Sequence, residues 1–194
     1  MVRPDFPFET DRLLLRPFTL EDVDDVLAWE ERADVHRFLY SQPRSRDEVR
    51  KELARRAAMT GIDHQSQAIR LAVLLRDGGA LVGDVSVQRT SMEHQQGEIG
   101  FLFHPAHHGR GYATEAGEMV LRLGFEGARL HRIVGRCDAR NEASARVMER
   151  LGLRREAHLI ENECIKGEWT DELIYAMLAT EWFARAGRMA QEDR

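Results

Sequence analysis

The chain has few cysteines, and their placement narrows the classes of protein to consider. Cys137 and Cys164 are the only two among 194 residues, and neither belongs to a CxxC pair. A zinc site built from cysteines is therefore excluded, and a disulfide framework is not expected. Two unpaired thiols suit a reducing compartment, so we expect a cytoplasmic protein.

Long hydrophobic runs are also lacking. No stretch of about 18 apolar residues occurs, and residues 1–11 hold no apolar core of a signal peptide. We therefore expect neither export nor a membrane partner. Lysine is nearly absent (Lys51 and Lys166), a bias typical of a GC-rich bacterial genome. The net charge of −5 gives no general attraction to nucleic acid, so no nucleic-acid partner is expected.

What is present is an ordinary globular composition, with 43% hydrophobic and 31% charged residues. The length fits one domain, which we place at residues 1–184, followed by a polar C-terminal tail at 185–194. Hydrophobic periodicity and turn signals then give the order of the elements. Strands are expected at 12–16, 69–75, 81–88, 97–103, 132–137, 153–165 and 170–178. Helices are expected at 20–31, at 46–59, after the Gly-rich turn 108–113 with residues 116–124 on it, and at 141–151.

This order combines antiparallel hairpins with a strand–helix–strand crossover. Such a combination predicts a mixed α+β sheet with helices on its faces. The most informative segment is the Gly-rich turn His108-Gly109-Arg110-Gly111-Tyr112-Ala113 between a strand and a helix. Free N–H groups and the dipole at a helix N-terminus favour an anion, and small residues let that anion approach. We therefore expect this turn to bind a pyrophosphate.

Two nucleotide-binding motifs do not account for the turn. A P-loop ends in Gly-Lys-Ser/Thr, and this turn has no lysine; a dinucleotide fingerprint needs a third glycine, which is missing after Gly111. Instead, Glu98-Ile99-Gly100-Phe101-Leu102-Phe103-His104-Pro105 followed by Gly109-Arg110-Gly111-Tyr112-Ala113-Thr114-Glu115-Ala116 resembles the acetyl-CoA-binding motif of GNAT acetyltransferases. The later segments Asn141–Arg146 and Leu151-Gly152-Leu153 resemble a second signature of that family.

The likeness extends over most of the chain, from about Glu9 to Trp182. Thr10-Asp11-Arg12-Leu13-Leu14-Leu15-Arg16-Pro17, and Gly167–Asp171 before Tyr175, resemble the RimJ/RimL-like subgroup. The resemblance implies the GNAT fold, with a twisted, mostly antiparallel seven-stranded sheet and helices on both faces. It also implies acetyl-CoA as acyl donor and transfer of the acetyl group to an amine by direct attack in a ternary complex.

Donor-binding residues follow from the same resemblance. The pantetheine arm would lie along Phe101, Leu102 and Phe103 as an added strand. The pyrophosphate would rest on the amides of Gly109, Arg110, Gly111, Tyr112 and Ala113. His108 stands where the family usually has Gln or Arg, so its contact with the pyrophosphate is open. Asn141 would both cap its helix and contact the pantetheine.

Amine acetylation needs a base to remove an ammonium proton and an acid for the departing thiolate. Glu98 is the candidate base; the alternative is a sheet-face carboxylate in an ion pair. Many GNAT enzymes use a tyrosine where this chain has Met148, so Ser144 is the candidate acid; the alternatives are an N-terminal helix position or protonation by water. No metal is expected, because His104, His107 and His108 have no further ligand at a suitable spacing.

The acceptor would lie between the first two helices and the late hairpin. Acidic residues there suggest a rim that favours a cation; they are Glu30, Glu31, Asp34, Glu161, Glu163, Glu168 and Asp171. A protein N-terminus, a polyamine, an amino sugar or an aminoglycoside would fit. A non-catalytic CoA-binding module and an O-acyltransferase are the alternatives. A homodimer paired through a sheet edge is a further hypothesis.

Overall fold

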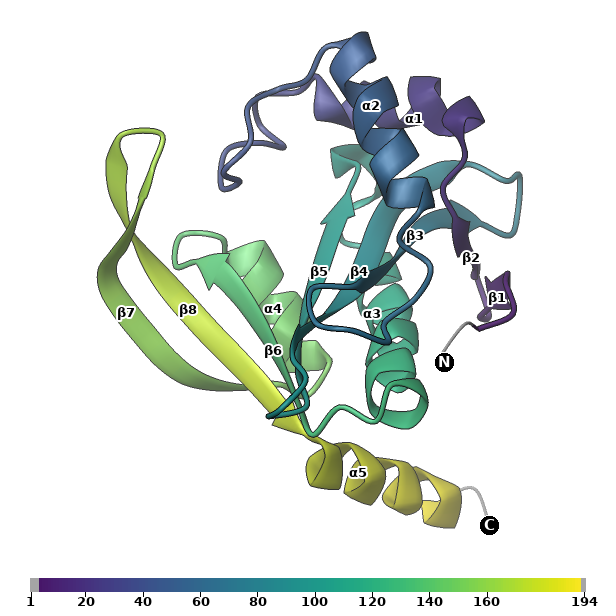
Figure 1. The fold of residues 1–194 in the computed structure, drawn as a ribbon, viewed down its shortest axis with the longest axis vertical. Helices are drawn as coiled ribbons and strands as arrows, with labels where there is room; N and C mark the ends of the chain where they lie inside the picture. Colours follow the sequence, from purple (N-terminus) through teal and green to yellow (C-terminus); the bar gives the residue numbers. More distant parts are fainter. Residues whose placement is uncertain (1–3, 193–194) are drawn as a thin grey trace.

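A single twisted sheet organises the chain, of which the computed structural model describes residues 4–192 (Figure 1). Its strands are β1 (Phe8–Glu9), β2 (Leu13–Pro17), β3 (Ala68–Leu75), β4 (Leu81–Ser91), β5 (Gln96–Phe103), β6 (Arg132–Asp138), β7 (Arg154–Ile165) and β8 (Glu168–Leu178). They lie in the order β1-β2-β3-β4-β5-β6-β8-β7. Every neighbouring pair is antiparallel except β5 and β6, which run parallel.

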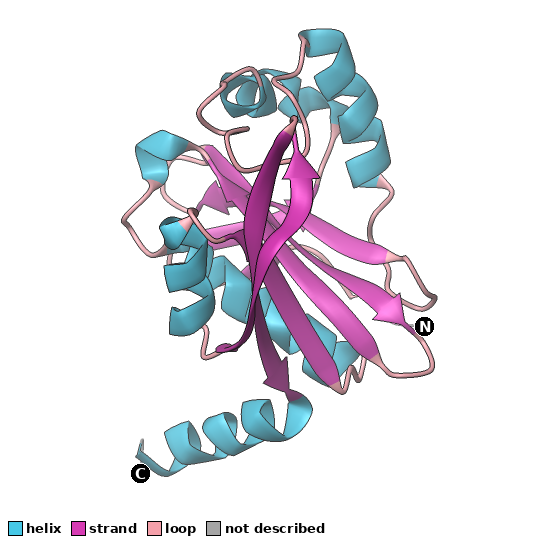
Figure 2. Cartoon of the chain, turned by 90° about the vertical axis from the view of Figure 1, so that its left-hand side faces the viewer, coloured by secondary structure: helices cyan, strands magenta, loops and turns pink. Residues whose placement is uncertain are grey.

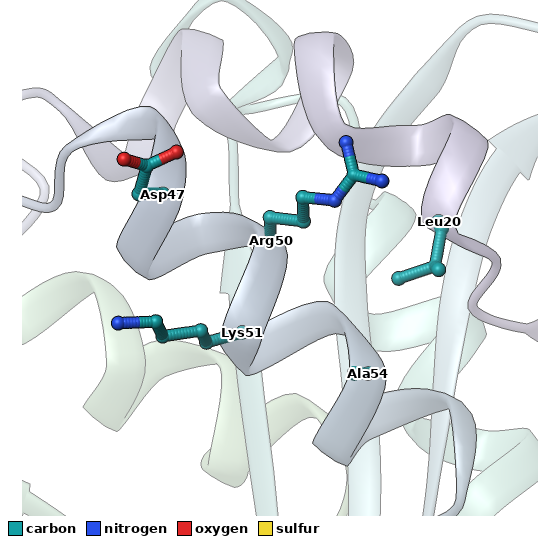
Figure 3. Close-up of a pocket in the computed structure, with 5 residues that line it drawn as sticks. All are labelled: Leu20, Asp47, Arg50, Lys51 and Ala54. Carbon is teal, nitrogen blue, oxygen red and sulfur yellow. The ribbon is translucent and has the colours of Figure 1, made fainter.

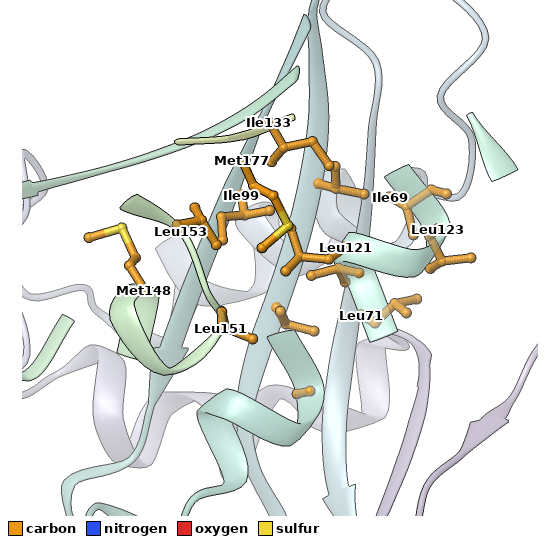
Figure 4. Close-up of a cluster of buried hydrophobic side chains, with 14 of the residues drawn as sticks. Ile69, Leu71, Ile99, Leu121, Leu123, Ile133, Met148, Leu151, Leu153 and Met177 are labelled. Atoms are coloured by element: carbon orange, nitrogen blue, oxygen red, sulfur yellow. The ribbon is translucent and has the colours of Figure 1, made fainter. Parts of the chain in front are cut away.

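Helices cover both faces of this sheet (Figures 1 and 2). They are the 3-10 turn η1 (Leu20–Asp22), α1 (Val23–Glu30), α2 (Arg46–Ala57), the 3-10 turn η2 (Pro105–His107), α3 (Tyr112–Arg122) with its π-helical extension η3 (Leu123–Gly127), α4 (Glu142–Arg150) and α5 (Ala179–Glu192). The apolar side chains form two cores. One packs α3 and α4 against the sheet, as Figure 4 shows for Leu121, Met148 and Ile99. The other packs Trp29 of α1 and Leu53 of α2 against the opposite face.

Local sequence signals explain where the helices begin. Ser45 and Glu48 form a capping box at the start of α2, with the Ser45 N–H donating to the Glu48 carboxylate at 2.8 Å. Asn141 caps α4 by accepting from the Ser144 N–H at 3.1 Å. The sequence therefore fixes the position of α4, and with it the orientation of Asn141 and Ser144.

Two neighbouring strands separate in the middle of the sheet. β5 and β6 pair through Gln96, Gly97 and Glu98 with Arg132, Ile133 and Val134, and the pairing ends there. The remainder of each strand, residues 99–103 and 135–138, bonds only to its outer neighbour β4 or β8. The parallel pair thus opens beyond Glu98 and leaves backbone groups of both strands facing a gap.

The expected architecture is confirmed, with differences at the edges. The sheet has eight strands rather than seven, because the two-residue β1 is too short to give a hydrophobic pattern. The helix expected from Leu20 starts as the turn η1 before α1. The segment 185–194, expected as a polar tail, is helical to Glu192 as the end of α5, and residues 193–194 lie outside the described part. Within residues 4–192, no helix is both long and apolar enough to cross a bilayer.

Candidate active site

The Gly-rich turn leads directly into α3. Gly109 and Gly111 have φ values of +75° and +80°, in the left-handed region that favours glycine. Gly111 is the N-cap residue, and its carbonyl accepts the first bond of the helix from the Glu115 N–H at 3.1 Å. The first N–H groups of α3 therefore have no partner within the helix, and Gly109 and Gly111 add no side chain beside them, which is the geometry of an anion site.

Arg12 of the segment before β2 clamps this turn. Its guanidinium donates to the Arg110 carbonyl at 2.9 Å, pairs with Glu115 at 2.6 Å, and lies over the Tyr112 ring at 4.9 Å from the centroid. Thr10 also donates to Glu115 at 2.5 Å. Burial acts to raise the pKa of Glu115, but the bonds from Thr10 and Arg12 outweigh it and lower the pKa below its usual value. Glu115 therefore links the first turn of α3 to the segment before β2.

His108 is also committed to the turn. Its Nε2 lies 2.8 Å from the Phe103 carbonyl and so ties the turn to the end of β5. The sequence left open whether His108 contacts the pyrophosphate; in the structure its imidazole contacts the backbone of β5. The backbone amides remain as the donors to an anion.

A cavity of about 540 Å³ joins the turn to the open end of β5. Nine of the ten residues expected to bind the donor line it; they are Phe101, Leu102, Phe103, His108, Gly109, Gly111, Tyr112, Ala113 and Asn141. Arg110 does not line it. The opposite wall comes from the α1–α2 loop, with Val35 and Phe38, and from α4, with Ser144, Arg146 and Arg150. The cavity lining thus combines apolar side chains with two arginines and one aspartate, Asp34.

Two polar atoms in the cavity wall lack a partner in the described chain. The Thr114 hydroxyl, in the first turn of α3, and His107 Nδ1 are buried without a hydrogen bond within residues 4–192. A buried hydroxyl or imidazole nitrogen without a partner costs free energy, so such groups normally serve a ligand or water. A phosphate oxygen at the N-terminus of α3 would satisfy Thr114. The residues present therefore fit a phosphate-bearing ligand such as CoA.

Glu98 lies at the last paired position of β5, where β5 and β6 separate. It shares a face of the sheet with Leu102, which packs against the core of α1 and α2, whereas Phe101 and Phe103 pack with α3 and α4. Its side chain is 37% exposed, so an incoming molecule can reach the carboxylate. Glu98 does not line the cavity itself; it lies three residues back along the same strand.

The environment of Glu98 suits proton abstraction. Burial raises the pKa of its carboxyl group; Arg136 acts to lower it, and Glu172 and Glu163 act to raise it further. The net effect is a pKa above the usual value for a glutamic acid. A carboxylate of raised pKa is a stronger base than a free one, which favours general-base chemistry near neutral pH.

Ser144 lies on the other side of the gap, on α4. Its backbone N–H donates to the capping side chain of Asn141, and Ser144 lines the cavity. Met148, one turn later, is 1% exposed and packs in the core, so it takes no part in proton transfer. Tyr175 is also buried, and its hydroxyl donates to Glu149 at 3.0 Å. Ser144 is thus the hydroxyl that α4 brings to the cavity.

The expected acidic rim is only partly present. The placement of Glu30 on this rim is wrong: Glu30 is 1% exposed and forms ion pairs with Arg56 and Arg44. Asp34, Glu168 and Asp171 pair with Arg32, Arg140 and His158. The two expected segments do meet, since Tyr40 donates to Glu163 and Lys166 donates to the His36 carbonyl at 2.5 Å.

The remaining candidates show no further chemistry. Within residues 4–192, no group of three or more His, Cys, Asp or Glu side chains is arranged to hold a metal ion. His104 instead accepts from the Ala106 N–H at 3.1 Å. A second depression lies on α2 beside Leu20, where Arg50 and Lys51 point in different directions (Figure 3). Its charged side chains are spread over an open surface and do not converge.

Sequence reasoning did not single out Arg12, Thr114, Arg136 or Glu172. Arg12 could have been found from the Thr10–Pro17 motif, because it is one of the residues in that motif that match the family. Thr114 had a signal in its place two residues after Tyr112, within the first turn of α3. Arg136 and Glu172 act through neighbours on other strands, and no spacing in the sequence predicts those contacts.

These features define an acyltransferase of the GNAT type, with a splayed sheet and a Gly-rich turn at a helix N-terminus. The acetyltransferase (GNAT) domain family matches residues 12–154, and the chain belongs to this family. The chain is 34% identical over 175 residues to YnaD, an uncharacterized N-acetyltransferase of Bacillus subtilis (strain 168). This match covers 89% of this chain and 97% of the relative. The protein is therefore an N-acetyltransferase of class EC 2.3.1.

Solved structures agree with this assignment. The structure of an acetyltransferase (GNAT family) from Bacillus anthracis shares 30% sequence identity and superposes with a TM-score of 0.81. The match covers 91% of this chain and 100% of the Bacillus anthracis chain. A spermidine N-acetyltransferase from Vibrio cholerae in complex with CoA and spermine superposes with a TM-score of 0.75 over 90% of this chain and 99% of its own. Its identity of 20% makes this a likeness of fold.

Proposed function

We propose that this N-acetyltransferase takes its acetyl group from acetyl-CoA and transfers it to a cationic primary amine by direct attack in a ternary complex. The observation that carries the proposal is the cavity that joins the separated strand β5 to the N-terminus of α3. It brings together strand backbone that is not paired with β6, the amides at the start of α3, and the Thr114 hydroxyl, which has no hydrogen-bond partner within residues 4–192. A molecule with a peptide-like arm and a pyrophosphate matches these groups in that order.

Individual residues have distinct roles in donor binding under this proposal. The pyrophosphate binds the amides of Gly109 to Ala113 and the Thr114 hydroxyl. The pantetheine arm lies along Phe101 to Phe103, beside Asn141. Acetyl-CoA supplies the thioester from which the acetyl group is transferred. The apolar walls at Val35 and Phe38 keep water from this region.

Proton transfer is assigned to Glu98 and Ser144. Glu98 takes the proton from the ammonium group, which leaves a neutral nitrogen to attack the acetyl carbon. A nitrogen–carbon bond forms as the carbon–sulfur bond breaks, and the leaving sulfur receives a proton from Ser144. The nitrogen then loses its second proton to solvent to give the neutral amide, and Ser144 regains a proton from solvent.

The acceptor is assigned to the face of the sheet that carries Glu98. Glu163 and Glu172 lie near Glu98 and give this face negative potential. This supports a small polyamine, an amino sugar, an aminoglycoside or a protein N-terminus over an anionic acceptor. The Thr10–Pro17 and Gly167–Asp171 motifs support placement in the RimJ/RimL-like subgroup.

Calorimetry with acetyl-CoA tests donor binding. Gly111→Asp places a carboxylate beside the turn and should raise the dissociation constant at least about tenfold. Gly79→Asp is the matched control: Gly79 also has a left-handed φ, +67°, but lies in the β3–β4 turn with open space around it. Failure of the folded wild type to bind acetyl-CoA would refute the proposal.

A panel of amines with thiol-release detection tests the transfer. Ser144→Ala should lower kcat by about tenfold to a hundredfold, because the leaving sulfur loses its proton donor, while acetyl-CoA binding stays within about twofold of wild type. An unchanged kcat would show that water protonates the thiolate. Acetyl-CoA binding without turnover of any amine would contradict the acceptor class.

A further inference from the structure

Arg136 joins two carboxylates across the gap between the strands. It lies on β6, two residues beyond Val134, the last partner of β5. Its Nε is 3.6 Å from Glu98 Oε2, and its Nη1 is 3.6 Å from Glu172 Oε1 on β8. One guanidinium therefore contacts a carboxylate on each side of its own strand.

We infer that Arg136 is a positioning residue for Glu98, holding its carboxylate ionised and fixed at the mouth of the gap. This inference rests on the proposed role of Glu98 as the base. A guanidinium suits the task because it presents several donors from one plane and stays charged at any working pH. Glu172 anchors the far side of the guanidinium, and it is itself only 5% exposed.

A second contact, from Asn162, restricts the position of the Glu172 carboxylate. Asn162 of β7 donates to Glu172 Oε2 at 2.9 Å, and Arg136 faces the other carboxylate oxygen. The bridge therefore runs from β7 through β8 and β6 to β5. A lysine at position 136 would keep the charge but offer less directional contact to two carboxylates.

The other groups around Glu98 make the bridge necessary. Glu172 from β8 and Glu163 from β7 both act against ionisation of Glu98, and Glu163 accepts from Tyr40 of the α1–α2 loop. Gln88, the partner of Glu98 on β4, is neutral. Among these groups, Arg136 is the cation that offsets burial and two like charges. Without it, the base would be protonated over more of the pH range.

The test compares two independent readouts of Glu98. The first is the acid limb of the pH profile of kcat/KM, measured by thiol release. The second is the titration of the Glu98 side-chain carboxyl carbon by NMR on ¹³C-glutamate-labelled chain, assigned with Glu98→Gln; this readout needs no turnover. Arg136→Gln should move both midpoints to higher pH by about one unit.

Three further variants separate positioning from general destabilisation. Arg136→Lys should return both midpoints most of the way to wild type. Arg136→Gln combined with Glu172→Gln should return them partly, since one opposing charge is gone. Arg132→Gln is the control: Arg132 lies on the same strand and face but pairs with Glu156, so the midpoints should not move.

The outcomes distinguish this inference from the proposed function. An NMR midpoint of Glu98 that is unchanged in Arg136→Gln overturns the inference even where Glu98 is the base. A moved NMR midpoint with full activity in Glu98→Gln overturns the base instead, and with it the catalytic meaning of the bridge. Equal shifts in both readouts, reversed by lysine, support the inference.

Discussion

Glu115→Gln is the sharpest test of how the phosphate-binding turn is held. The Glu115 carboxylate accepts from the Thr10 hydroxyl at 2.5 Å, from the Arg12 N–H at 3.0 Å and from Arg12 Nε at 2.7 Å. Its side chain is 17% exposed. Glutamine keeps one oxygen for Thr10 but turns an amide N–H₂ or a neutral oxygen toward the Arg12 guanidinium. The substitution therefore removes the ion pair and leaves the rest of the turn in place.

The expected loss of stability follows from these contacts. A hydrogen bond to a charged group contributes about 1.5–3 kcal/mol. Arg12 is half exposed, at 51%, so solvent screens its share. We therefore expect Glu115→Gln to lower the free energy of unfolding at pH 7 by about 1–2 kcal/mol, which corresponds to about 2–8 °C in Tm for a chain of this size.

The effect should depend on pH with a definite sign. The pKa of Glu115 in the folded protein lies below its unfolded value of 4.5, so the stabilisation is complete above about pH 4.5. It is lost as the pH falls through the folded pKa. Urea unfolding of wild type and variant between pH 7 and pH 3 should therefore show two stabilities that converge on acidification.

Glu142→Gln is the matched control. Glu142 is also a first-turn carboxylate, at the start of α4, but its side chain is 77% exposed and pairs with Arg146 one turn later. Such a pair contributes about 0.2–0.5 kcal/mol, so this variant should stay close to wild type. A gap between wild type and Glu115→Gln that is absent at pH 7, or equally large at pH 3, would refute the reasoning.

Three further predictions concern the core, the thiols and the cavity. Gly135→Ala places a Cβ 2.5 Å from Met148 Sδ, so it should cost about 1–3 kcal/mol in urea unfolding; with Met148→Ala the two losses should sum to more than the double variant shows, and strict additivity would contradict this. Burial raises the pKa of Cys137 to about 11, so iodoacetamide at pH 8 should alkylate the exposed Cys164 at least about tenfold faster, as mass spectrometry would show; equal rates would contradict it. Thr114→Val should weaken acetyl-CoA binding about fivefold in calorimetry without lowering stability in urea; a large loss of stability would instead mark Thr114 as a structural residue.

Local signals account for the parts of the fold that sequence predicted. Ser45 and Asn141 specify the starts of α2 and α4 through side chains three residues from their partners. Gly109 and Gly111 mark the turn because few other residues adopt a positive φ. The turn, the helix after it and the following capped helix are therefore legible in the sequence, and they supply most of the cavity.

Contacts between distant segments account for the parts that it missed. Glu30 was expected on the acidic rim of the acceptor site. In the structure it is buried against Arg56, 26 residues later, and no periodicity predicts that pairing. Arg136 and Glu172 meet because β6 pairs directly with β8, although β7 separates the two strands in the sequence. Ion pairs between strands depend on register, which the sequence leaves open.

The two proposed proton-transfer groups approach the gap from opposite faces of the sheet. Glu98 shares a face with Leu102 and the α1–α2 core, whereas Ser144 is carried by α4 on the other face. Side chains alternate along β5, so a shift of one residue in its register would exchange Glu98 for Ile99 and place the base among α3 and α4. The position of Gly97 opposes such a shift, because the shift would bring a residue with a Cβ there. That Cβ would lie 2.6 Å from Leu130 and 2.8 Å from the Gln88 carbonyl. Under the proposed roles, the packing at Gly97 thus keeps the base on the acceptor side and leaves the donor side to the turn and α4.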